Sequence, residues 1–355
     1  MKQIPIQKIE TLSEIKFADK RLAGKICLSP FVQIAINLAG KVRLCGCADW
    51  MPTTIGNLYE NKLEDLLSSP LAQKIKKSIT DGSYSYCNEN TCGIIRNNLL
   101  NTIDDVPDSV KVQIEDVSKY IMPREIFIAG DITCNLSCPS CRKQVLKPSK
   151  ELQKKNLLMM QLLKKNIFSK PTDQEITLTL STTGELFSSK SLLFFLNSIP
   201  LNDFPNVNLN IQTNGLLCEK NWHKLKKLQD RVKKITVTID AATCETYEKL
   251  RQGGKWSEIL SSMQWLKNKK QENNMLLHTR MVVQKDNYSQ ILEFYKLSQT
   301  FLADVIEYVR LQDWHSMTPE QFIESDVLNP SHLEYSLAKH HMSLVQDLPG
   351  AQTWG

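Results

Sequence analysis

The second half of the chain repeats one pattern of hydrophobic and polar residues. Short apolar runs, several of them alternating with polar residues, predict β-strands at residues 124–133, 175–181, 207–213, 235–240, 277–284 and 304–312. Longer amphipathic segments between them predict helices at residues 150–166, 190–199, 219–230, 255–271 and 288–302. Regular alternation of strands and helices indicates an α/β fold with parallel strands and right-handed crossovers.

Six strand–helix units are too few for a complete eight-stranded barrel. The pattern is compatible with an open doubly wound sheet or with a partial barrel. Both architectures bind ligands beyond the carboxyl ends of their strands. We therefore expect functional residues directly after each predicted strand.

The first part of the chain has a different organisation. Residues 30–45 alternate around Ala39-Gly40 and predict a β-hairpin, and residues 63–79 have helical spacing that Pro70 interrupts. The predicted segments are a lead-in (1–26), a small cysteine-rich α+β unit (27–100), a connector (101–123), the β/α series (124–312) and an irregular extension over the mouth or base of the barrel (313–355).

Composition narrows the class of protein. The chain has 41% hydrophobic and 23% charged residues and a net charge of +6, which is ordinary for a soluble globular protein. Lysine-rich pieces at 224–228 and 267–270 predict solvated helix faces, since no basic stripe with interleaved aromatics suggests a nucleic-acid partner. Residues 1–10 lack the apolar core of a signal peptide, and no apolar run reaches the roughly 18 residues of a membrane span. We expect a cytoplasmic protein without a membrane partner, whose ten cysteines are ligands or redox groups rather than disulfides.

Three cysteines follow the first predicted strand of the β/α series. Cys134, Cys138 and Cys141 have the spacing C-x3-C-x2-C. Structural zinc needs four ligands, and no histidine lies nearby. An iron–sulfur cubane with three thiolates would leave one iron open to an exogenous ligand, as a catalytic cluster requires.

This loop resembles the signature loop of the radical S-adenosylmethionine (SAM) superfamily. The resemblance implies a partial (β/α)6 TIM-like barrel and a 4Fe-4S cluster held by Cys134, Cys138 and Cys141. It also implies that SAM binds the open iron and is cleaved reductively to a 5′-deoxyadenosyl radical that abstracts a substrate hydrogen. A flavodoxin- or ferredoxin-type protein would supply the electron.

Segments after the second and third strands are similar to further motifs of this family. Thr183-Gly184-Glu185 resembles its Gly-Gly-Glu segment, with the first glycine replaced. The resemblance implies that Glu185 receives the amino group of SAM, whereas the local alternative is an ordinary strand-to-helix turn. Asn214 lies in a Thr-Asn-Gly sequence that recurs in the family and can equally be a turn.

Later strand ends complete the predicted SAM site. The resemblance implies that Thr238 and Arg251 bind the carboxylate of SAM, and a guanidinium forms a forked pair with such a group. Their alternatives are a β-branched strand residue and a solvent-facing helix residue. Gln284 and Asn287 lie where relatives place polar groups near the nucleoside, or they form a turn. Ser140 departs from the family, since many relatives have an aromatic residue before the third cysteine.

Five cysteines precede the barrel. Their arrangement resembles the auxiliary-cluster modules called SPASM and twitch domains, which implies a second, auxiliary 4Fe-4S cluster. The candidate ligands are Cys27, Cys45, Cys47, Cys87 and Cys92. Cys47 either replaces Cys45 or stays free, and four thiolates would also suit zinc. The module is placed unusually, because it commonly follows the barrel.

Two further cysteines stand alone. Cys218 and Cys244 lie just beyond strand ends, and radical epimerases of the superfamily use such a thiol to return a hydrogen atom. The alternative for each is a small buried hydrophobic residue.

Three functions remain open from the sequence. The first is radical modification of a peptide or protein, which auxiliary-cluster members of the superfamily often perform. The second is oxidation or epimerisation of a small polar substrate such as an aminosugar. The third is a zinc-binding module without catalysis.

Overall fold

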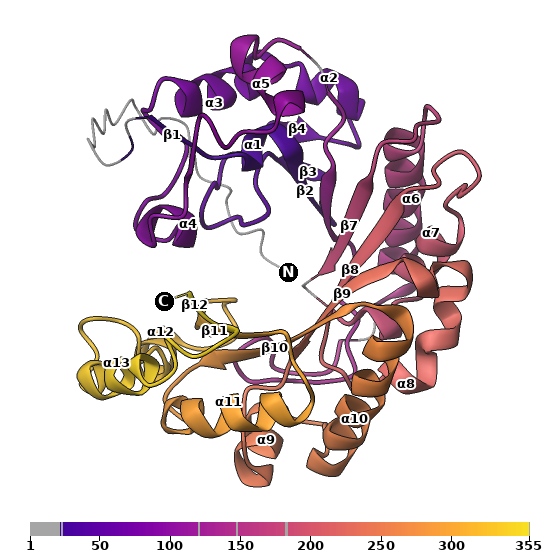
Figure 1. Cartoon of the computed structure of the whole chain (residues 1–355). Helices are drawn as coiled ribbons and strands as arrows, with labels where there is room; N and C mark the ends of the chain where they lie inside the picture. The colour runs from indigo at the N-terminus through magenta and orange to yellow at the C-terminus, as the bar shows by residue number, and fades with distance from the viewer. Residues whose placement is uncertain (1–21, 23, 120, 147, 182–183, 355) are drawn as a thin grey trace.

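A curved sheet organises the structure, which is a computed structural model. It describes residues 22, 24–119, 121–146, 148–181 and 184–354. Six parallel strands lie side by side in chain order: β6 (Glu125–Ala129), β7 (Ile176–Ser181), β8 (Val207–Thr213), β9 (Val232–Thr238), β10 (Leu276–Val283) and β11 (Val305–Arg310). Figure 1 shows their helices on the outer side of the curve. The six-strand partial barrel that the sequence predicted is therefore confirmed.

The crossover helices follow the predicted order with two differences. They are α6 (Lys150–Ile167), α7 (Lys190–Asn197), α8 (Cys218–Asn221), α9 (Cys244–Leu250), α10 (Trp256–Asn273) and α11 (Ile291–Thr300). The helix predicted over 219–230 is instead the short α8 followed by a 3-10 segment, η3 (Trp222–Arg231). Within η3, Lys226 has a non-helical conformation (φ 50°, ψ −120°), so the segment is two short turns joined by a kink, with Trp222, Leu225 and Leu228 buried. The other difference is α9, a short helix that the sequence pattern did not predict.

Both edges of the six-strand sheet gain a further parallel strand. The predicted N-terminal hairpin is present as β2 (Gln33–Asn37) and β3 (Lys41–Arg43), and β2 pairs in parallel with β6 from Gln33↔Glu125 to Asn37↔Ala129. At the other edge β12 (Ala351–Trp354) pairs in parallel with β11. With β4 (Gly56–Asn57) beyond β3, the sheet has ten strands. Backbone hydrogen bonds between β2 and β6 thus join the cysteine-rich unit to the barrel.

The remaining N-terminal elements form a small layer above this hairpin. They are β1 (Lys25–Ile26), α1 (Ser29–Val32), α2 (Leu63–Leu67), α3 (Pro70–Thr80), α4 (Gly93–Arg96), β5 (Asn101–Thr102) and α5 (Asp108–Glu115). Pro70 begins α3, and the Ser69 side chain accepts a hydrogen bond from the Ala72 amide, so the predicted interruption separates two helices. A separate apolar cluster around Phe31, Ile79 and Tyr84 stabilises this layer.

The C-terminal extension is not irregular, contrary to the expectation from sequence. It forms α12 (Pro319–Ser325), α13 (Tyr335–Ser343) and β12. Thr318 and Gln321 make a capping box at the start of α12, with Pro319 at the first helical position. Trp354 of β12 reaches the N-terminal unit, where a Cβ added to Gly93 would lie 3.1 Å from the Trp354 ring. No helix in the described part of the chain is long and apolar enough to span a bilayer.

The two faces of the sheet have opposite polarity. On β8 the residues Val207, Leu209 and Ile211 are fully buried beneath the helices. Because successive side chains of a strand point to opposite faces, the alternate residues Asn208, Asn210 and Gln212 face the concave side, which we call the lumen. Parallel strands covered on both faces are normally apolar throughout. A polar lumen therefore distinguishes this sheet from one with a purely structural interior.

The shared sheet generates a stability prediction. Ile34 of β2 is fully buried in the main core, so Ile34→Ala should lower the free energy of unfolding by about 2–5 kcal/mol and shift the transition of the barrel. Urea unfolding followed by far-UV circular dichroism measures this. The control is Ile323→Ala on α12, where the side chain is 61% exposed. A separate low-stability transition, with the barrel transition unchanged, would contradict a shared sheet.

Candidate active site and auxiliary metal centre

Asp131 fixes the start of the three-cysteine loop, two residues after β6. Its Oδ1 accepts hydrogen bonds from the amide and hydroxyl of Thr133, and its Oδ2 accepts bonds of 2.6 and 2.8 Å from Ser189 and Ser191. Ser189 is also the N-cap of α7. Burial opposes the charge, but the hydrogen bonds from Ser189 and Thr133 outweigh it and lower the pKa of Asp131. A charged carboxylate therefore ties the loop to the neighbouring helix.

Gly184 lets the second strand end pass directly beneath this loop. A Cβ at Gly184 would lie 2.5 Å from the carbonyl oxygen of Asp131 and 2.6 Å from that of Thr133. The next amide, of Glu185, donates to the Thr133 carbonyl at 2.8 Å. The retained glycine of the predicted motif is thus required by close backbone approach. Thr183, the third predicted member of this segment, lies outside the described residues.

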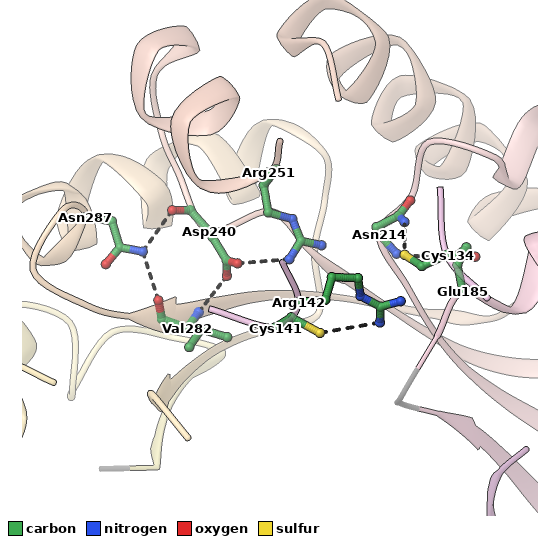
Figure 2. A network of polar contacts seen from close by, with 9 residues as sticks. All are labelled: Cys134, Cys141, Arg142, Glu185, Asn214, Asp240, Arg251, Val282 and Asn287. Atoms are coloured by element: carbon green, nitrogen blue, oxygen red, sulfur yellow. Dashed lines mark hydrogen bonds and ion pairs between the residues drawn. The ribbon is translucent and has the colours of Figure 1, made fainter. Parts of the chain in front are cut away.

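Two of the three thiols, Cys134 and Cys141, accept hydrogen bonds from nitrogen donors. Cys134 Sγ accepts from the Leu136 amide at 3.5 Å and from Asn214 Nδ2 at 3.8 Å. Cys141 Sγ accepts from Arg142 Nη2 at 3.4 Å, as Figure 2 shows. Burial raises the pKa of Cys134 and of Cys138. Metal loading must therefore release protons from these thiols.

Glu185 joins the ends of β7 and β8. Its carboxylate accepts from Thr213 Oγ1 at 2.8 and 2.9 Å, from the Asn214 amide at 2.8 Å and from the Phe187 amide at 3.2 Å. The side chain is buried, and this burial raises its pKa. The predicted contact of Glu185 with SAM stays a prediction, whereas its contacts with the Thr-Asn-Gly turn are present. Asn214 in turn donates to both Cys134 and Asn135, so the turn contacts the three-cysteine loop.

Arg251 and Asp240 form a buried ion pair on the opposite side of the loop. Arg251 Nη1 lies 3.1 Å from Asp240 Oδ2, and Asp240 Oδ1 accepts from the Val282 amide at 2.7 Å (Figure 2). Burial raises the pKa of Asp240, while Arg251 opposes this shift. Asp240 has φ 65°, an uncommon conformation for a residue other than glycine. Sequence reasoning did not single out Asp240, although its position directly after a strand was the available signal.

Asn287 joins the turn that follows β10 to Asp240 by hydrogen bonds. Asn287 donates 2.9 Å bonds to the carbonyls of Asp240 and Val282 and accepts from the Gln284 amide. It therefore acts as a turn former, one of the two alternatives. Thr238 ends β9 in register with Arg280, at the level of the predicted carboxylate site.

Two buried nitrogen donors near the loop have no hydrogen-bond partner within the described residues. They are Arg251 Nε and Gln284 Nε2. Arg251 also interacts electrostatically with Cys138 and Cys134, and its pKa is raised despite burial. Orphaned buried donors are costly unless a ligand accepts from them. The donor set therefore fits an acceptor-rich, partly anionic ligand such as SAM beside a three-thiolate cluster.

The two isolated thiols lie in contrasting environments. Cys218 starts α8, is fully buried, and has its Sγ 3.7 Å from Thr213 Oγ1. Cys244 starts α9 and is exposed. Their proposed role as hydrogen donors stays a prediction. The C-terminal extension also reaches the loop, because Ser316 Oγ donates to the Pro139 carbonyl beside Ser140 at 2.9 Å.

Four of the five N-terminal thiols surround one cavity. Cys27, Cys45, Cys87 and Cys92 line it together with Tyr84, Trp50 and aliphatic residues. Burial raises the pKa of each of these thiols, to about 12 for Cys45. Cys47 lies outside this lining. Across the described ranges no three Cys, His, Asp or Glu side chains converge as tightly as the ligands of a single metal ion. Four thiols around one cavity fit a cluster.

Comparison with known proteins gives two family matches. Residues 132–298 match the radical SAM superfamily, and residues 27–93 match the SPASM family, an iron–sulfur cluster-binding domain. A comparison with curated protein sequences gives no match.

The similarity to solved structures is distant. Streptococcus suis SuiB bound to its precursor peptide SuiA is 13% identical with a TM-score of 0.44, covering 80% of this chain and 62% of SuiB. The enzyme anSMEcpe with bound AdoMet and the Cp18Cys peptide is 13% identical with a TM-score of 0.37, covering 53% and 51%. A radical SAM methyltransferase from Sphaerobacter thermophilus is 13% identical with a TM-score of 0.41, covering 62% and 63%. The chain thus spans less than two thirds of each of these relatives.

The family matches coincide with the two thiol sites described above. The chain thus carries a radical SAM domain over residues 132–298 and a SPASM iron–sulfur cluster-binding domain over residues 27–93, ahead of its barrel. It is an enzyme whose cofactors are SAM, the 4Fe-4S cluster of the three-cysteine loop and an auxiliary 4Fe-4S cluster.

The close approach at Gly184 predicts a selective loss of one cluster. Gly184→Ala should displace the loop backbone, because the new Cβ meets two carbonyl oxygens that cannot move independently. We expect iron per chain to fall from about eight to about four after anaerobic reconstitution, with the auxiliary cluster retained. Iron and sulfide analysis with absorbance near 400 nm measures this. Retention of both clusters would show that the loop tolerates the added atom.

The cavity lining predicts different effects for the two neighbouring thiols of the hairpin. Cys45→Ser should remove a ligand and reduce iron by about four per chain, whereas Cys47→Ser should leave it unchanged. Anaerobic iron analysis of the two variants prepared in parallel decides between them. The reverse result would assign Cys47 as the ligand.

Proposed function

We propose that this enzyme modifies a peptide substrate bound in the lumen of its barrel. When bound, the SAM cluster and SAM supply a 5′-deoxyadenosyl radical that abstracts a substrate hydrogen. The observation that carries the proposal is the chemistry of the lumen, together with the auxiliary-cluster domain beside it.

The lumen presents amide and hydroxyl side chains on neighbouring strands. Asn208, Asn210 and Gln212 alternate along β8, and Asn210 Nδ2 donates to Thr179 Oγ1 of β7 at 3.5 Å. Side-chain amides both donate and accept hydrogen bonds. Each residue of an extended peptide has a backbone N–H that needs an acceptor and a C=O that needs a donor. The side-chain amides of the lumen can therefore form hydrogen bonds with such a backbone.

A charged group continues this surface across β10 and β11. Glu307 accepts from Arg280 Nε at 2.7 Å and lies 3.0 Å from His278 Nδ1. Burial would raise the pKa of Glu307, but the His278 hydrogen bond and the Arg280 charge bring it down to about 2. The buried Nε2 of His278 has no partner among the described residues. Because Nδ1 of His278 faces Glu307, Nε2 is the ring nitrogen left to form a hydrogen bond with a polar group of the substrate.

The auxiliary cluster would exchange electrons with the substrate or with an external carrier. Four protein thiolates leave such a cluster no open position for direct substrate binding. We propose a flavodoxin- or ferredoxin-type protein as the electron donor of the enzyme.

A small polar substrate such as an aminosugar is the second candidate. Its hydroxyl and amino groups would use the same amide, threonine and His278 positions of the lumen. The decisive experiment therefore separates substrates by size and by sensitivity to protease.

The experiment measures 5′-deoxyadenosine formed by the reconstituted enzyme with SAM and dithionite. Extract of the source cells is added as fractions below about 1 kDa and of about 1–10 kDa. We expect the larger fraction to raise the rate above the substrate-free level, and prior protease digestion of that fraction to abolish the increase. Stimulation by the small fraction alone would favour an aminosugar-type substrate. Cys138→Ala is the control and should abolish 5′-deoxyadenosine formation in every sample.

The lowered pKa of Glu307 predicts a pH dependence of stability. Its folded pKa of about 2 lies below the ordinary 4.5, so its stabilising contribution is complete above about pH 4.5 and is lost as pH falls toward 2. The difference corresponds to about 3 kcal/mol for this buried group. Glu307→Gln should therefore be less stable at pH 7 and lose less stability on acidification to pH 3.

Urea unfolding between pH 7 and pH 3 measures this effect. Glu293→Gln, at an exposed position of α11, is the matched control and should follow the wild type. If the free energy of unfolding fell equally with pH in the wild type and in Glu307→Gln, Glu307 would not be the source of the pH dependence.

A further inference from the structure

Arg142 is held against the SAM-cluster loop at two points. Its Nη1 donates to the Ile132 carbonyl at 2.7 Å, and its Nη2 donates to Cys141 Sγ at 3.4 Å. The residue is only 9% exposed. Figure 2 shows the guanidinium extending from the loop back toward the Cys141 sulfur. The side chain is thus fixed in place rather than free in solvent.

The charge of Arg142 acts on the whole thiol set. It interacts electrostatically with Cys141, Cys134 and Cys138. At a buried position such interactions are stronger than in water. A cluster with three thiolates carries negative charge that increases on reduction, so a nearby cation stabilises the reduced form. Hydrogen bonds to ligand sulfur act in the same direction.

The second arginine of the site, Arg251, is paired with the buried carboxylate of Asp240. Its orphaned Nε leaves it suited to a ligand. Arg142 instead donates to a thiol that ligates the cluster. Both arginines act electrostatically on the thiols, and Arg142 in addition donates a hydrogen bond to Cys141 Sγ.

We propose that Arg142 is a positioning residue that makes the SAM-binding cluster easier to reduce. It acts through Cys141, by an N–H···S hydrogen bond and by its fixed positive charge. The inference rests on the three-cysteine cluster and is independent of the substrate.

The test is an EPR-monitored redox titration of the reconstituted protein without substrate. Arg142→Met should lower the midpoint of the SAM-binding cluster, with at least a tenfold fall in the reduced-to-oxidised ratio at the wild-type midpoint, about 59 mV for one electron. Arg142→Lys retains the charge and should recover most of the shift. The auxiliary cluster of the same molecules should keep its midpoint.

Arg43→Met is the matched control at the other centre. Arg43 interacts electrostatically with Cys45 and Cys47. Its substitution should shift the auxiliary midpoint and leave the SAM-binding cluster unchanged. If Arg142→Met loses iron, the midpoint potential is measured in Arg142→Gln instead. This variant keeps N–H donors and removes only the charge.

Two results would overturn the proposal. One is an unchanged midpoint in variants that retain about eight irons per chain. The other is an equal shift in Arg142→Lys and Arg142→Met, which would exclude the charge as the cause. Because no substrate is added, neither result bears on the peptide proposal.

Discussion

The three-cysteine loop contains little regular structure, so its shape depends on hydrogen bonds from neighbouring strand ends. Asp131 joins it to the N-terminus of α7, and the Glu185 amide joins it to the end of β7. The Ser137 amide donates to the Gln252 carbonyl beyond α9. Contacts from these separate crossovers converge on one short segment. The partial barrel is therefore the support that gives the loop a single conformation.

Electrostatics divides the interior into zones of different character. Around the loop, two arginines face thiols whose burial raises the pKa of Cys134 and Cys138. Deeper in the lumen, Glu307 stays ionised between Arg280 and His278. Charges of both signs are therefore fixed by partners before any ligand arrives. Such preorganisation lowers the reorganisation required when charge moves.

Sequence could predict features that depend on local spacing. The order of the six strands, the N-terminal hairpin and the break at Pro70 each follow from patterns within a few residues. It could not predict that β2 pairs with β6, because their register joins residues 92 positions apart, such as Gln33 and Glu125. Asp240 and the His278–Glu307 pair were not found for the same reason, since their partners lie on other elements. Arg142 was missed although its partners Ile132 and Cys141 lie on its own loop. The start of α12 was missed although its capping box lies within four residues.

One edge of the sheet contacts the N-terminal unit through side chains rather than through a strand ladder. β12 and β4 are the outermost strands, and Trp354 of β12 packs against Gly93, the first residue of α4. This contact is a seam along the side of the barrel, and no strand pairing crosses it within the described residues. Among the described residues, widening of this seam would break no strand–strand hydrogen bond of the sheet. In a closed barrel, the strand–strand hydrogen bonds set both the rigidity of the wall and the width of the interior. In this sheet the wall can stay rigid while the width of the interior changes.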